Sequence, residues 1–142
     1  MNWIRKLWRR YKVGAEANNF PIKDCGLFGD KLKKPRTLSE AVRAMDYILT
    51  DKDKERFQEW DEDKIIAATH HNIGRWIRNN WGLWDESSKL HKFFKSLGIW
   101  HADDMSGIIL TTYYRKVHNL LPKLDEQIAH YIEYWKKCDT QS

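Results

Sequence analysis

The 142-residue chain has few of the residues that build covalent or metal-linked scaffolds. Its two cysteines, Cys25 and Cys138, lie far apart and lack a metal-ligand spacing. Two such thiols are typical of a reduced, cytoplasmic protein, although a single bridge between them stays open. His70 and His71 are adjacent, so their side chains point in different directions and form no ligand pair. The sequence therefore predicts neither a metal nor a cofactor.

Long apolar runs and catalytic signatures are also missing. No run of 18 apolar residues could span a bilayer, and no apolar segment follows the early charges as in a signal peptide. The chain has no G-x-S-x-G, no cysteine with local support for nucleophilic attack and no glycine-rich phosphate loop. A nuclease-like set of His, Arg and Asp could still assemble from distant positions. We expect binding without catalysis and assign no catalytic residue.

The net charge of +5 is unevenly distributed. Residues 1–36 hold ten basic and three acidic residues, whereas residues 37–142 hold fifteen and seventeen. Residues 2–12 have the pattern of a short amphipathic helix, with Trp3 and Trp8 on its apolar face and a basic opposite face. Such a helix could contact its own domain, another protein, a lipid surface or nucleic acid, and its tryptophans could seal a homo-oligomer. Residues 13–36 lack periodicity, so we interpret residues 1–36 as an arm.

Residues 37–142 have the apolar spacing of helices, with no competing strand alternation. Thr37, Thr50 or Asp51, Asp61, Ser87 and Asp103 are the expected helix caps, and Pro122 is expected in the first turn of the last helix. That last helix should face inward through Leu124, Ile128, Tyr131, Ile132 and Trp135. The prediction is an all-α single domain, an irregular bundle of six to seven helices.

Residues 70–84 carry the densest recognition chemistry, HHNIGRWIRNNWGLW. The spacing predicts one central helix over residues 62–81, with an inward stripe that includes Trp76 and Trp81. Gly74 in the middle of this helix costs about 1 kcal/mol relative to alanine. That cost indicates a close approach, either of a neighbouring helix or of a bound group.

We predict a ligand pocket on this helix because arginine forks bind phosphate or carboxylate and tryptophan stacks on flat rings. The candidate ligand is a small anionic, nucleotide-like molecule. Asp103 and Asp104 would orient the arginines in this pocket. The alternative to a ligand pocket is a structural role, in which the arginines pair with carboxylates and the histidines bond to neighbouring helices. The predicted binding residues are His70, His71, Arg75, Arg78, Asn79, Trp81 and Trp84.

The run from His70 to Trp84, with LGIWHADDMSGIIL over residues 97–110, resembles a family of small bacterial and phage domains of unknown function. The resemblance covers about residues 37–120, and the family pattern has a proline where this chain has Ala102. It implies a role in a bacterial or phage conflict system. We therefore expect a ligand-binding protein or, alternatively, an immunity or inhibitor protein that binds a toxin or defence protein through the same surface.

Overall fold

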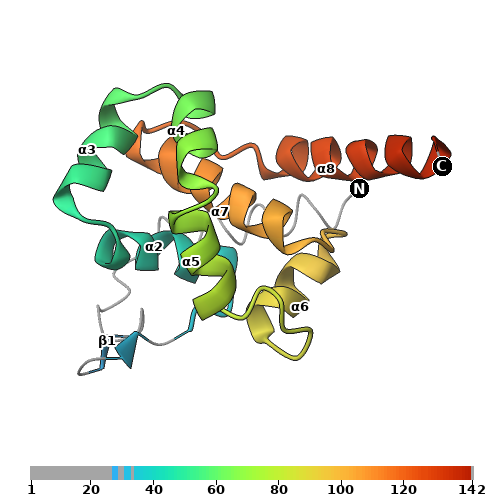
Figure 1. Ribbon diagram of the computed structural model, residues 1–142, viewed down its shortest axis with the longest axis horizontal. Coiled ribbons are helices and arrows are strands. Elements are labelled where there is room, and N and C mark those ends of the chain that lie inside the picture. Colours follow the sequence, from blue (N-terminus) through green and yellow to red (C-terminus); the bar gives the residue numbers. More distant parts are fainter. Residues whose placement is uncertain (1–26, 29–30, 33, 142) are drawn as a thin grey trace.

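The structure is a computed structural model that describes residues 27–28, 31–32 and 34–141 (Figure 1). The predicted N-terminal helix over residues 2–12, most of the predicted loop and Cys25 lie outside the described residues. Cys138 is a half-buried free thiol on the last helix.

The prediction of an all-α domain is confirmed for the described part of residues 37–142. Its helices are α2 (Leu38–Ile48), α3 (Asp51–Glu59), α4 (Glu62–Thr69), α5 (Ile73–Asn80), α6 (Lys89–Ser96), α7 (Ala102–Val117) and α8 (Leu124–Thr140). A short antiparallel pair precedes them, β1 (Leu27–Phe28) and β2 (Lys31–Leu32), with Leu27 opposite Leu32. The bundle is irregular because the helices differ in length and cross at varied angles (Figure 1).

Polar caps start most of these helices, close to the predicted positions. The Thr37 and Thr50 hydroxyls accept backbone N–H groups of the first turns of α2 and α3, as expected. Ser88 caps α6 in place of Ser87, and His101 caps α7 in place of Asp103. The proline at 122 precedes α8, which starts after Lys123.

Helix α7, and not the segment 62–81, is the centre of the bundle. It contacts each of the other six described helices, and ten of its sixteen residues are buried (Figure 1). Small side chains in the first turns of α7 let neighbouring helices approach closely, namely those of Ala102, Ser106 and Gly107. Larger aliphatic side chains follow and fill the core, namely those of Ile108, Ile109 and Leu110. Each such aliphatic side chain contributes about 1.5–3 kcal/mol when fully buried, so α7 carries much of the packing energy.

Helix α8 packs on this core only through its first half. Leu124 and Ile128 are fully buried, and the Tyr131 hydroxyl lies so close to Gly107 that an added Cβ there would be 2.7 Å from it. The C-terminal part of the helix projects past the body of the domain (Figure 1). Trp135, which the sequence pattern places inward, is therefore 42% exposed. Among the described helices, none has the length and apolarity needed to cross a membrane.

Candidate functional site

The predicted central helix is interrupted at residues 70–72, which separate α4 from α5. The Asn72 side chain accepts the Ile73 backbone N–H and so caps a new helix. Thr69, at the end of α4, bonds back through its hydroxyl to the Ile65 carbonyl at 2.7 Å. The single helix predicted over residues 62–81 was wrong, because apolar periodicity continues across the interruption and hides it.

The guanidinium of Arg78 holds this interruption together. The Arg78 side chain is only 6% exposed. Its Nη2 donates to the His70 carbonyl oxygen at 3.0 Å. The break in the helix leaves this carbonyl without a backbone N–H partner. Nη1 donates to Ser106 Oγ at 2.8 Å, and Nε lies 3.2 Å from Asp103 Oδ1. Ser106 in turn donates to the Asp103 carbonyl. One buried arginine thereby joins α4, α5 and the first turns of α7.

The close approach predicted over Gly74 comes from this same arginine. A Cβ at Gly74 would lie 3.0 Å from Arg78 Nη1, 3.2 Å from the Thr69 carbonyl oxygen and 3.6 Å from a Leu110 methyl group. The glycine therefore leaves room for the guanidinium between the break and α7. Its cost within the helix is explained by packing of the chain on itself.

The seven predicted binding residues separate into different environments. Arg78 is buried against α7, and Trp81 is 1% exposed within the core. His70 is half-buried, its ring centroid 4.7 Å from that of His71, and burial together with the Arg78 charge lowers the pKa of His70. The remaining four are exposed, namely His71, Arg75, Asn79 and Trp84. Whether any of these residues binds a ligand stays a prediction.

Of the two predicted orienting carboxylates, Asp103 contacts Arg78 and Asp104 faces elsewhere. Asp104 Oδ2 accepts the Trp135 indole N–H at 2.7 Å, which ties α7 to α8. Burial raises the pKa of Asp104, and the hydrogen bond from Trp135 and the charges of His101 and His130 only partly offset it. Two neighbouring acids thus lie in different electrostatic surroundings.

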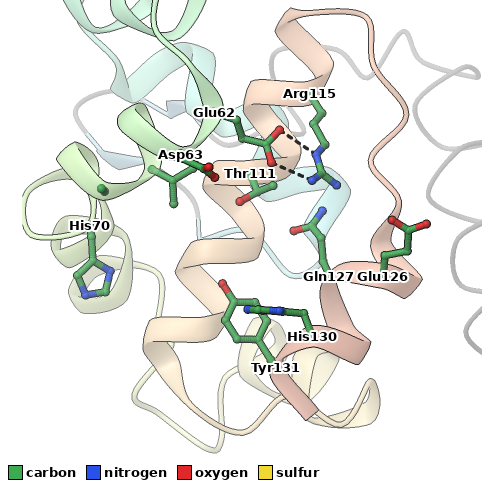
Figure 2. A pocket seen from close by; sticks show the side chains of 11 residues that line it. Glu62, Asp63, His70, Thr111, Arg115, Glu126, Gln127, His130 and Tyr131 are labelled. Atoms are coloured by element: carbon green, nitrogen blue, oxygen red, sulfur yellow. Dashed lines mark hydrogen bonds and ion pairs between the residues drawn. The ribbon is translucent and has the colours of Figure 1, made fainter. Parts of the chain in front are cut away.

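A cleft of about 570 Å³ lies between α4, α7 and α8 (Figure 2). Glu62 on α4 pairs with Arg115 on α7 through two contacts, Oε1 to Nη2 at 2.8 Å and Oε2 to Nε at 3.1 Å. Arg115 Nη1 also donates to the Pro122 carbonyl, so this guanidinium is committed to protein groups. Its planar fork suits such a bridge between helices.

The rest of the cleft lining combines apolar side chains with polar ones that are acidic on balance. Asp63 and Glu126 face the cleft without a partner cation in the described part of the chain (Figure 2). The other lining residues are Ile66, Ala67, His70, Thr111, Gln127, His130 and Tyr131. Carboxylates in excess of cations disfavour an anion here. Within the described residues, no three His, Cys, Asp or Glu side chains come close enough together to hold a metal ion.

An exposed aromatic row lies beside the cleft, composed of Trp84, His101, Trp135 and Tyr134. The centroids of Trp84 and His101 are 6.1 Å apart, His101 stacks on Trp135 at 5.6 Å and 23°, and Trp135 meets Tyr134 edge-on at 5.3 Å. Trp84 is 58% exposed and Tyr134 54%. The sequence pattern identified Trp84 as a binding residue but not the other three. Trp135 and Tyr134 are exposed because α8 projects past the body of the domain, and His101 joins the row as the cap of α7.

These observations define a small helical domain built around one buried helix, with an exposed aromatic row at the α7–α8 side. The chain belongs to a family described as a domain of unknown function (DUF6794), whose model matches residues 34–117. The resemblance to a family of unknown function is thereby confirmed. The matched segment includes Arg78, Trp84 and Asp104, whereas α8 lies beyond it. No curated protein and no solved structure matches this chain.

Replacing Arg78 tests its role in holding the fold. We expect Arg78→Ala to lower the free energy of unfolding by about 2–3 kcal/mol, because it leaves the His70 carbonyl, Ser106 and Asp103 without their donor. Arg75→Ala on the same helix removes an equal charge from an exposed position and should change stability by less than about 0.5 kcal/mol. Urea unfolding of both variants measures the difference. Equal, small effects would show that Arg78 is not a structural arginine.

The stability of an Asp104→Asn variant should depend on pH in a defined direction. Because the folded-state pKa of Asp104 is raised, its favourable contribution is complete below the ordinary pKa and is lost as pH rises through the folded value. An asparagine does not titrate and can still accept the Trp135 N–H. The unfolding free energy of the variant, taken relative to that of wild type, should therefore rise as pH increases from the ordinary aspartate pKa of about 3.9 towards neutrality. A difference that falls with rising pH contradicts the assignment.

Proposed function

We propose that this domain is a non-enzymatic binding protein that holds a protein partner through the aromatic row and the hollow beside it. The exposure of Trp84, Trp135 and Tyr134 in one continuous row is the observation that supports this most strongly. Aromatic side chains are enriched at the centres of protein interfaces, where each buries a large area at a low cost in side-chain entropy. A row of them left in water indicates a surface that a partner covers.

The origin of the row in the fold supports the same proposal. Trp84 follows α5, His101 caps α7, and Trp135 and Tyr134 lie on α8, so three separate segments supply one surface. The indole N–H of Trp135 donates a hydrogen bond to Asp104, and the His101 ring stacks on the Trp135 ring. Contacts among the rings therefore fix their positions in advance, which reduces the ordering cost of association.

Charge favours a protein partner with basic side chains over an anionic molecule. The hollows beside the row present Asp63, Glu126 and Asp104, while Arg78 and Arg115 are already occupied by carboxylates and carbonyls. An acidic surface repels phosphate and attracts lysine or arginine. An inhibitor or immunity protein of a bacterial or phage conflict system, acting on a toxin or defence protein, is the setting that we propose.

The small anionic, nucleotide-like ligand is the competing proposal. Its best support is Arg75, which is exposed on α5 four residues after His71. Such a site would have to work without Arg78, whose donors are used inside the fold. A single exposed guanidinium is strongly hydrated, so it binds phosphate more weakly than two converging ones.

Site-specific photo-crosslinking tests the protein-binding proposal. The photo-reactive amino acid p-benzoylphenylalanine replaces Trp84 or Tyr134 in the full chain, and Glu55 on α3 serves as the exposed control at the opposite end of the bundle (Figure 1). We expect positions 84 and 134 to yield the same discrete adduct in cells that make the protein, and position 55 to yield none. The purified partner should then bind Trp84→Ala at least about 30-fold more weakly than wild type.

Three results would contradict this proposal. The first is an adduct that forms equally from all three positions, and the second is a partner that binds Trp84→Ala as well as it binds wild type. The third is a calorimetric titration in which a nucleotide binds the wild-type protein and Arg75→Ala abolishes the heat. That third result would establish the anionic ligand instead.

A further inference from the structure

A pocket of about 360 Å³ lies between the first turn of α7 and the middle of α8. Asp104 and His101 line it from the α7 side, and Tyr131, Tyr134 and Trp135 line it from α8. Tyr131 packs closely on Gly107 at this point, and a residue larger than glycine would require the Tyr131 hydroxyl to shift. The pocket is thus a product of helix packing and is formed before any partner arrives.

The carboxylate of Asp104 differs from those of Asp103 and Glu62 in having no guanidinium partner among the described residues. Asp103 pairs with Arg78 and Glu62 pairs with Arg115, each with a guanidinium. Among the described residues, the titratable groups that influence the pKa of Asp104 are His101, His130 and Asp103, and none of them is a lysine or arginine. The position of Asp104 in the first turn of α7 is favourable, but burial still raises its pKa. A cation in the pocket would supply the missing charge.

The rings around this carboxylate favour the same kind of ligand. Trp135 and Tyr134 both line the pocket and are substantially exposed, and the faces of aromatic rings carry the negative end of their quadrupole. Aromatic faces attract ammonium and guanidinium groups within about 6 Å of the ring centroid, and they pack against the methylene stems of lysine and arginine. Asp103, which pairs with Arg78, and His130 complete the lining of the pocket.

We propose that the pocket of Asp104, Trp135 and Tyr134 binds a cationic side chain, lysine or arginine, presented by the protein partner. The ammonium or guanidinium pairs with the Asp104 carboxylate, and the stem lies against the two rings. This assignment rests on the proposed function, since it identifies the chemistry that the partner brings to the aromatic row.

Nuclear magnetic resonance of the full chain with short peptides tests this proposal directly. The probes are Ac-Gly-Arg-Gly-NH₂ and Ac-Gly-Lys-Gly-NH₂, each compared with its neutral counterpart, which contains citrulline or acetyl-lysine. The reporters are the Trp135 indole N–H, assigned with Trp135→Phe, and the backbone amides of Tyr134 and Trp135. We expect saturable shifts with the two cationic peptides and at least tenfold weaker binding of the neutral ones.

Two variants separate recognition from general charge. Asp104→Asn should weaken binding of the cationic peptides at least tenfold while the protein stays folded. Asp51→Asn, which removes the same charge from the first turn of α3, should leave binding unchanged. Neutral peptides that bind as well as cationic ones, or an Asp104→Asn variant that binds normally, would overturn the pocket assignment.

This experiment can fail independently of the proposed function. If the peptides do not bind but positions 84 and 134 still crosslink to one partner, the pocket assignment is wrong and the aromatic row remains an interface. If the peptides bind but no partner crosslinks, the pocket remains and the proposed protein-binding function is wrong.

Discussion

The buried guanidinium of Arg78 is the contact on which the arrangement of helices around α7 depends. A chain that breaks a helix between residues 69 and 73 leaves carbonyl groups without partners, and a buried unpaired carbonyl is costly. Arg78 satisfies the carbonyl of His70 and at the same time bonds to Ser106 and pairs with Asp103. The desolvation cost of the charge is offset only because all three groups converge on it. Gly74 and Ser106 are small because the guanidinium occupies the space between them.

This use of Arg78 determines where recognition can occur. Asp103 and Asp104 are adjacent, so about 100° of helix rotation separates their side chains. One faces Arg78 and serves the fold, whereas the other faces α8 and bonds to Trp135. The first turn of α7 therefore contacts the buried Arg78 guanidinium on one side and lines the aromatic pocket next to α8 on the other. We propose that partner binding uses this second side.

Local signals in the sequence were sufficient for much of the fold. Apolar spacing and the threonine caps predicted the helices, and the family resemblance covered nearly the segment that the family model matches. The break at residues 70–72 was not predicted in this way, because apolar spacing continues across it and Arg78, which bonds to the freed His70 carbonyl, is held by contacts to α7. Capping by His101 was missed for a related reason, because Asp103 is the commoner capping residue but is used by Arg78. The sequence identified only part of the candidate surface. Trp135 and Tyr134 are exposed because α8 extends past the body of the domain, which apolar spacing does not indicate (Figure 1).

The most direct test of this account is the exchange rate of the arginine side-chain Nε–H protons, measured by nitrogen-resolved nuclear magnetic resonance. The account predicts that the Nε–H of Arg78 exchanges slowly with water and keeps its chemical shift when nucleotides are added, whereas that of Arg75 exchanges rapidly. A rapidly exchanging Arg78 Nε–H, or one that shifts on addition of a nucleotide, would contradict the claim that this charge belongs to the fold and not to a ligand.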